Sequence, residues 1–124
     1  MDAMPFVCIV NTWELKREGF VSPIVHPSDH AGENEGSRML HLRPDLVHAD
    51  KFADNKLGKV KVKALAQAEF ARPWHLFMPM SAGGDSRLAT AEKGKLELAS
   101  EIDALAGLLV ELSAAKWDER FPYE

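Results

Sequence analysis

The sequence has little of what would reveal its chemistry directly: one cysteine, few aromatic residues and no long apolar run. A lone cysteine, Cys8, cannot form an internal disulfide, so we expect a reducing compartment. No segment approaches the roughly 20 consecutive apolar residues that a membrane-spanning helix requires. The first residues carry Asp2 where a secretory signal would place lysine or arginine. These absences predict a cytoplasmic protein that does not bind a membrane.

Positive charge is also in short supply. The formal net charge is −4, which argues against a dedicated nucleic-acid binder, because such affinity depends on excess lysine and arginine. The 124 residues are 46% hydrophobic and 27% charged, a composition typical of a single globular domain over residues 1–124. A chain of this size can bury enough surface to fold without a disulfide or a metal. We therefore expect no cofactor and no structural metal.

Four segments carry strand-like patterns. The clearest is Lys59–Phe70, where valines and alanines alternate with lysines and other polar residues. Its second half, Ala64–Glu69, also suits a helix, but the two-residue period favours a strand. The other three predicted strands are short and apolar: Phe6–Trp13, Phe20–Val25 and Trp74–Met80. Cys8 lies in the first of them and is expected to be a buried small hydrophobe.

A long helix is predicted from Ser86 to Trp117, because its leucines and alanines form a continuous apolar stripe. Asp85 or Ser86 stands where a capping residue is preferred. An unbroken helix of this length would measure about 48 Å at about 1.5 Å per residue. A globule of this size is only about 35 Å across. Either Gly94 or Gly107 therefore marks a break or a close helix crossing, or a second copy covers the overhanging helix in a homodimer.

These elements predict an α+β fold, with a small, mainly antiparallel sheet and a long C-terminal helix packed on one face of it. The tail after the helix carries Phe121 and Tyr123, which we expect to fold back against the body of the protein. Between the second and third predicted strands, His26–Ser37 has almost nothing apolar and is expected to be an exposed loop.

The predicted loop holds nitrogen and oxygen donors that could in principle bind a divalent metal: His26, Asp29, His30, Glu33 and Glu35. Their spacing matches no metal-binding motif, and Pro27 argues against a helix that would bring both histidines to one face. A polar, solvated loop is therefore favoured, and metal binding by it is left open. The sequence alone pairs no aspartate or glutamate with any histidine.

Small residues precede the long helix in the turn Ser81–Arg87. Such a turn exposes backbone amides that can bind a phosphate or a carboxylate, with help from the helix dipole. The candidate anion-binding residues are Gly83, Gly84, Ser86 and Arg87. The turn lacks the lysine of a nucleotide-binding loop, and Asp85 would repel an anion unless it caps the helix. A plain turn with a helix cap is the alternative.

Three lysines, Lys59, Lys61 and Lys63, would project from one face of the predicted middle strand. Lysines at the edge of a sheet commonly prevent aggregation with other sheets. The functional alternative is a basic stripe that binds an acidic protein or a nucleic-acid backbone, because such charge steers association.

No zinc spacing, nucleophile elbow, phosphate loop or repeat is evident. The predicted function is therefore non-enzymatic: a small intracellular inhibitor, immunity or adaptor protein that binds another protein through Lys59, Lys61 and Lys63. The alternative is a small enzyme or ligand-binding protein that uses the Ser81–Arg87 turn as an anion site and a histidine as acid or base. A second alternative, nucleic-acid binding by the lysines, is disfavoured by the net charge.

Overall fold

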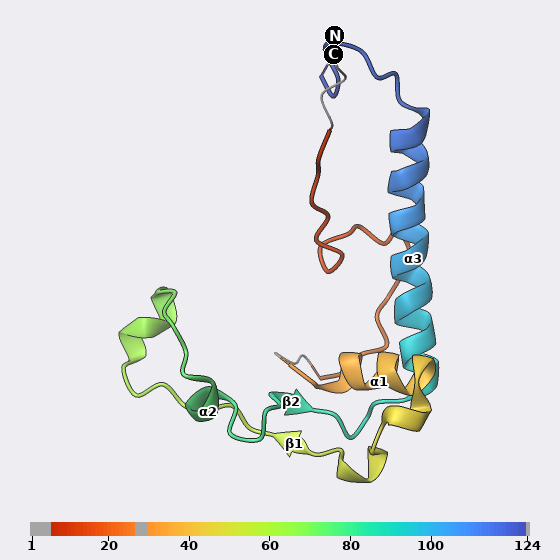
Figure 1. Cartoon of the computed structure of the whole chain (residues 1–124). Helices are drawn as coiled ribbons and strands as arrows, with labels where there is room; N and C mark the ends of the chain where they lie inside the picture. Colours follow the sequence, from red (N-terminus) through yellow and green to blue (C-terminus); the bar gives the residue numbers. More distant parts are fainter. Residues whose placement is uncertain (1–5, 27–29, 124) are drawn as a thin grey trace. The chain divides into compact units, whose positions relative to one another are not determined.

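The computed structural model describes residues 6–26 and 30–123 (Figure 1). The chain divides into two compact units, one formed by Met1–Phe20 with Ala99–Glu124 and the other by Val21–Leu98. The expectation of one domain stays a prediction. In chain order the elements are α1 (Glu33–Leu42), 3₁₀ turns at Pro44–Leu46 and Ala49–Lys51, β1 (Asp54–Asn55), a 3₁₀ turn at Lys63–Gln67, α2 (Trp74–Phe77), β2 (Gly84–Asp85) and α3 (Ala91–Ala114).

The described sheet is small and antiparallel, as predicted. Its two strands, β1 and β2, pair Asp54 with Asp85 and Asn55 with Gly84. Ser86 fixes the end of this ladder, because its buried hydroxyl both accepts from the amide and donates to the carbonyl of Ala53. Together with the long C-terminal helix, this sheet confirms the α+β class in its coarse form.

Helix α1 begins inside the predicted exposed loop His26–Ser37, so that prediction was wrong from Glu33 to Ser37. Its buried face is small and polar rather than apolar: Glu33 and Ser37 are both fully buried. The Ser37 hydroxyl accepts a hydrogen bond from the Thr90 amide at 3.1 Å. Gly94 of α3 lies against the Ser37 backbone so closely that a Cβ would overlap its carbonyl oxygen. The helix is held by backbone approach and hydrogen bonds, which a search for apolar stripes does not detect.

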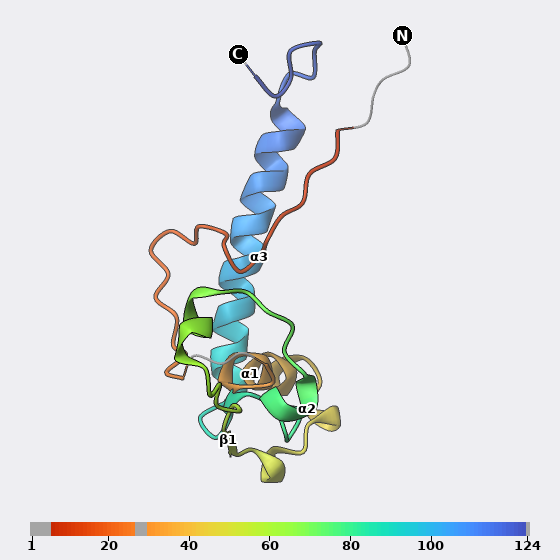
Figure 2. The same ribbon diagram turned by 90° about the vertical axis from the view of Figure 1, so that its left-hand side faces the viewer.

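Helix α3 confirms the predicted long C-terminal helix, but it begins at Ala91 rather than at Ser86. Neither Asp85 nor Ser86 caps it. The Thr90 hydroxyl accepts from the Lys93 amide at 3.2 Å, the arrangement of a capping residue. Figure 2 shows α3 as one uninterrupted ribbon. Gly94 therefore marks a close helix crossing and not a break, and a Cβ at Gly107 would meet nothing within 4 Å.

The four predicted strands are wrong. Within Lys59–Phe70, residues Lys63–Gln67 form a 3₁₀ turn, and Trp74–Phe77 is the helix α2. Phe6–Trp13 and Phe20–Val25 belong to no strand of the described chain. In the middle segment the alternation does not mark a buried face, because Val60 and Val62 are each at least half exposed. The helical alternative for Ala64–Glu69 agrees better with the structure, because residues 64–67 lie in the 3₁₀ turn.

The unit that contains both chain ends is organised around aromatic side chains. The rings of Trp117 and Phe121 stack with their centroids 4.2 Å apart, and Phe6 meets them edge-on at 5.6 and 5.0 Å. The tail thus contacts the chain through Phe121, as expected, whereas Tyr123 is 82% exposed, so the expectation was wrong for that residue. Cys8 is exposed, so the prediction of a buried cysteine was wrong.

Few hydrophobic side chains are fully buried. Met78 is the only one among residues 6–26 and 30–123, and it packs near Gly83. Two fully buried carboxylates accompany it in the same unit: Glu33, and Glu97, which accepts a hydrogen bond from the Ser22 hydroxyl. Over the described residues, no helix combines the length and the apolar character needed to cross a bilayer.

Candidate functional site

Two segments that the sequence analysis treated separately lie together in the unit Val21–Leu98. The loop around His30 pairs with the Ser81–Arg87 turn through an antiparallel bridge to Gly83. The His30 amide donates to the Gly83 carbonyl at 3.3 Å, and the Gly83 amide donates to the His30 carbonyl at 2.8 Å. In the same unit, His26 of the first segment lies beside Asp85 of the second.

Asp85 is held by three hydrogen bonds from Arg87. The Arg87 guanidinium donates to it in a two-bonded fork, from Nε at 2.9 Å and from one terminal nitrogen at 2.6 Å. The Arg87 amide adds a third bond at 3.0 Å. These bonds, the guanidinium first, hold the pKa of the Asp85 carboxyl well below its usual range. Asp85 therefore stays ionised at neutral pH, with His26 Nε2 at 3.8 Å from its Oδ2.

His30 has its own acidic neighbour and an aromatic wall. Its Nδ1 lies 3.8 Å from Oε2 of Glu35, in the first turn of α1. The same carboxylate accepts a hydrogen bond from the Ala31 amide at 2.5 Å. The ring of Trp74 stands edge-on to the imidazole, with the centroids 5.3 Å apart. Both histidines are partly exposed, so solvent and a small ligand can reach them.

The backbone is strained on both sides of the bridge. Ala31 has φ +50° and Ser81 has φ +54°, left-handed values that residues with a Cβ seldom adopt. Ala31 follows His30 directly, and Ser81 precedes the bridging Gly83 by two residues. Strained backbone of this kind concentrates at functional sites, where the surrounding structure enforces it.

Glu33 anchors the loop from beneath. One carboxylate oxygen accepts from the backbone amides of Val25 and His26, at 3.1 and 2.8 Å, and the other accepts from Lys93 Nζ at 2.6 Å. Burial alone would raise the pKa of this carboxyl, but the bonds from Lys93 and the two amides outweigh burial and lower it. A charged, fully bonded Glu33 thus fixes the backbone that carries His26.

The predicted anion-binding residues are engaged within the protein. Gly83 serves the bridge, Gly84 lies in β2, and the Ser86 hydroxyl bonds Ala53. Arg87 is paired with Asp85, and a terminal nitrogen also lies 3.8 Å from Asp54. No finding tests anion binding by these residues, which stays a prediction. The paired hydrogen bonds from Arg87 hold the Asp85 carboxylate in place beside His26.

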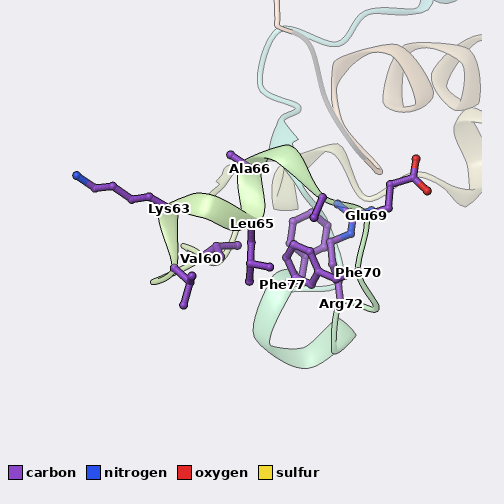
Figure 3. A pocket seen from close by; sticks show the side chains of 10 residues that line it. Val60, Lys63, Leu65, Ala66, Glu69, Phe70, Arg72 and Phe77 are labelled. Atoms are coloured by element: carbon purple, nitrogen blue, oxygen red, sulfur yellow. The ribbon is translucent and has the colours of Figure 1, made fainter.

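The three lysines lie in the segment that was wrongly predicted as a strand. Lys59 and Lys61 are exposed in irregular chain, and Lys63 is the first residue of the 3₁₀ turn. The common strand face that would have gathered the three ammonium groups is therefore absent. The segment instead borders an open groove of about 620 Å³. In Figure 3, Phe70, Arg72 and Phe77 lie together in it, whereas Lys63 and Glu69 extend outward.

Metal ligation finds no support in the described part of the chain, where no three histidine, cysteine or acidic side chains converge. Asp29, one of the predicted donors, lies outside the described residues. The sequence analysis missed the acidic partners of both histidines. Glu35 follows His30 by five residues across a helix start, a weak signal. Asp85 lies 59 positions from His26, and only the folded chain brings them together.

Comparison with known proteins gives a consistent result. Residues 2–109 match the sequence profile of a family described as Creatininase, creatinine amidohydrolase. No curated protein matches the chain. A crystal structure of a Bacteroides fragilis protein assigned as a creatinine amidohydrolase is similar, with 31% sequence identity and a TM-score of 0.74. This match covers 89% of the present chain and 44% of the other.

Two further solved structures are tryptophan-to-phenylalanine mutants of a creatininase. Each has 25% identity to this chain and a TM-score of 0.54, over 68% of its length. The matches cover 32% and 31% of those two chains. The present chain therefore spans less than half the length of each solved structure that it resembles.

Proposed function

The chain belongs to the creatininase family, and from this premise we propose that it supplies part of the active site of an amidohydrolase. The proposed reaction is hydrolysis of the amide C–N bond of a small cyclic amide of the creatinine type. The observation that carries the proposal is the pairing of a solvent-accessible imidazole, His26, with a fixed carboxylate, Asp85.

Membership of the creatininase family shows that the function predicted from the sequence was wrong. A non-enzymatic inhibitor, immunity or adaptor protein is contradicted by the family match and by the similar solved structures, which are named as hydrolytic enzymes. The alternative, a small enzyme that uses a histidine near the Ser81–Arg87 turn, agrees better with these findings. The error arose because absent motifs were taken as evidence, although the acidic partners of the histidines are distant in sequence.

In the proposed mechanism His26 acts as the general base. A water molecule attacks the amide carbonyl carbon while the imidazole removes a proton from it. The ionised Asp85 faces the imidazole and stabilises the imidazolium that forms, and Arg87 keeps that carboxylate in place. The proton then passes to the leaving nitrogen as the C–N bond breaks. One water is consumed: its hydroxyl ends on the carbonyl carbon, which becomes a carboxyl group, and its proton ends on the freed nitrogen.

His30 is proposed to bind the substrate beside this pair. Its imidazole is held between Glu35 and the ring of Trp74, which leaves an aromatic edge and a polar nitrogen at the same place. A small planar amide presents a similar combination of a flat face and polar atoms. The histidine–carboxylate distances of 3.8 Å are longer than hydrogen bonds, and such contacts often tighten only when substrate is bound.

We also propose that the chain forms part of a larger α+β domain, in which α3 covers one face of a sheet more extensive than β1 and β2. The similarity to the Bacteroides fragilis protein supports this, because the fold of nearly all of this chain corresponds to less than half of that one. The activity of a whole creatininase is accordingly proposed only for this chain in combination with the remainder of such a domain.

The test is a hydrolysis assay with creatinine, in which mass spectrometry detects the ring-opened product. The chain is assayed alone and together with the complementary polypeptide, which we define as the part of the Bacteroides fragilis protein that this chain does not match. We expect product in at least one arrangement. His26→Asn should lower the rate about 100-fold or more, because a general base typically contributes this much.

His41→Asn is the matched control, since His41 is exposed in the last turn of α1 and touches none of the site residues named above. It should leave the rate unchanged. Absence of product in both arrangements, or an equal loss in the two histidine variants, would contradict the proposed function.

A further inference from the structure

Lys93, in the first turn of α3, has an ammonium group that bonds to two different segments of the chain. It donates to Oε1 of Glu33 at 2.6 Å and to the backbone carbonyl of Leu88 at 2.9 Å. The Lys93 side chain is 21% exposed and the Glu33 side chain is fully buried, so water has little access to this ion pair. A charge-assisted bond in such a place is fixed more firmly than a bond between exposed side chains.

The bond to Glu33 leads to the proposed general base. The second oxygen of the Glu33 carboxylate accepts from the backbone amides of Val25 and His26 at 3.1 and 2.8 Å. Both oxygens of the carboxylate are therefore engaged, one by the Lys93 ammonium and the other by the segment that ends at His26. The ammonium thus holds the backbone of His26 through a single intervening carboxylate.

The bond to Leu88 leads to the carboxylate that faces this base. Leu88 follows Arg87 directly in the chain, and the Arg87 guanidinium holds Asp85 through bonds of 2.9 and 2.6 Å. The Lys93 ammonium therefore fixes the backbone carbonyl next to the residue that positions Asp85. One charged group is bonded to the supports of both members of the proposed catalytic pair.

The spacing of that pair is not fixed by a direct hydrogen bond, because His26 Nε2 lies 3.8 Å from Oδ2 of Asp85. The spacing depends on how the two segments are held. The bridge between His30 and Gly83 joins them at one point, and the bonds of Lys93 join them at a second. A single connection leaves two segments free to rotate about it, whereas two connections fix their relative orientation.

We propose that Lys93 is a positioning residue for hydrolysis, which sets the distance between the His26 imidazole and the Asp85 carboxylate by tying their supporting segments to one ammonium group. Lys93 takes no part in the proton transfer. Because a misplacement of about 1 Å can lower a rate about 100-fold, its effect falls on the chemical step. This inference rests on the proposed function, and its first test needs no substrate.

The first experiment follows the carboxyl carbon of Asp85 by NMR while the isolated chain is titrated. Bonds from Arg87 hold the pKa of the Asp85 carboxyl well below its usual range, and Arg87 stays charged throughout. Histidine is the side chain that changes charge between about pH 5 and 8. A movement of the Asp85 signal in that range therefore reports a neighbouring imidazole. It should occur in the parent chain and disappear in His26→Asn.

Lys93→Met is the test variant, since it keeps the length of the side chain and removes the charge. The movement of the Asp85 signal should become at least about threefold smaller, because the effect of a charge falls with distance. Lys93→Arg retains the charge and should restore most of the movement. Lys95→Met makes the same change at an exposed position of α3 and should leave the parent value.

Circular dichroism checks that Lys93→Met retains the helices of the parent chain. If it does not, Lys93→Gln takes its place. Glutamine is neutral but can still donate a hydrogen bond, and it is too short to reach both oxygens that Lys93 contacts. Lys93→Gln should therefore reduce the movement of the Asp85 signal as Lys93→Met does.

The second experiment measures kcat and KM for creatinine in whichever arrangement of the parent chain is active. Lys93→Met should lower kcat about tenfold or more and leave KM within about twofold. KM changes little because His30 and Trp74, which are proposed to contact the substrate, are unaltered. When Asp85→Asn is already present, Lys93→Met should have little further effect on kcat, because the pair that Lys93 positions has been lost.

Four results would overturn the proposal. One is a parent Asp85 signal that does not follow His26, and another is a signal that still follows it in the neutral Lys93 variants. The third is an equal reduction in Lys95→Met. The fourth is a set of effects on kcat in which Lys93→Met and Asp85→Asn multiply, since a purely structural role would give this result. If no arrangement hydrolyses creatinine, the proposed function fails, whereas the NMR titration still decides whether Lys93 positions the pair.

Discussion

At the scale of single residues, the acidic side chains Glu33 and Asp85 have different tasks. Glu33 is buried and satisfied by a lysine and two amides, so it holds a loop in place. Asp85 is fixed by Arg87 but faces a histidine that solvent can reach. Both carboxyls have pKa values lowered by hydrogen bonds, and in both the ionised form is the working form.

Replacing Glu33 with Gln should destabilise the loop and α1 by about 1–3 kcal/mol, because Lys93 loses its charged partner in a buried place. Hydrogen exchange of the α1 amides measures the effect. Glu111→Gln makes the same chemical change at an exposed position of α3 and should alter protection by less than about 0.5 kcal/mol.

The effect of Glu33→Gln should also depend on pH in one direction. The folded pKa of Glu33 lies below its ordinary value of 4.5, so its contribution to stability is fully present above that pH and is lost as the pH falls through the folded value. The difference between parent and variant should therefore shrink as the pH falls below 4.5. A difference that stays constant or grows on acidification would contradict the assigned role of Glu33.

At the scale of elements, the crossing of α1 and α3 decides how the site is built. Gly94 allows the backbone of α1 at Ser37 to approach α3 directly. This approach positions the beginning of α1, and with it Glu33 and Glu35, beside the Gly83 bridge. The glycine is therefore a packing requirement, even though it lowers intrinsic helix stability.

Gly94→Ala should destabilise the unit Val21–Leu98 by about 2 kcal/mol or more, because the new methyl group overlaps the Ser37 carbonyl. Gly107→Ala is the matched control in the same helix. With nothing within 4 Å of its Cβ, it should stabilise α3 by about 0.5–1 kcal/mol. Urea unfolding of both variants, monitored by circular dichroism, measures whether each substitution lowers or raises the free energy of unfolding. Equal effects at the two glycines would refute the close crossing.

The elements also indicate what the sequence could and could not predict. The leucine stripe was sufficient to predict the helix α3, because a long amphipathic pattern is a strong signal. The Lys59–Phe70 alternation was not sufficient to predict a strand, since alanines and exposed valines can alternate with polar residues outside a sheet. Helix α1 was missed because Glu33 and Ser37 are buried by hydrogen bonds and not by apolar contact.

The sequence analysis named the segments of the candidate site but did not predict the site itself. Histidines and acidic residues of the His26–Glu35 segment, and the Ser81–Arg87 turn, were both identified from the sequence. Their contact was not, because it depends on the bridge between His30 and Gly83, which are far apart in the chain. Anion binding by Arg87 stays a prediction, but the pairing of its guanidinium with Asp85 was not foreseen from the sequence.

At the scale of the whole molecule, the chain belongs to the creatininase family but buries few hydrophobic side chains fully among the residues described. The chain has a formed cluster of histidines and carboxylates, but few fully buried hydrophobic residues among those described. It spans less than half of the similar creatininase structures. Both observations agree with the proposal that this chain supplies part of an active site within a larger α+β domain.

The central claim is that Asp85 works with His26 in hydrolysis and is not merely another surface carboxylate. The most direct measurement compares creatinine hydrolysis by Asp85→Asn and Asp45→Asn, in whichever arrangement of the parent chain is active. Asp45 forms the same arginine fork with Arg43, at 2.9 and 2.6 Å, but lies outside the site. We predict that Asp85→Asn lowers the rate at least about tenfold while Asp45→Asn leaves it unchanged. Equal rates in the two variants would contradict the account.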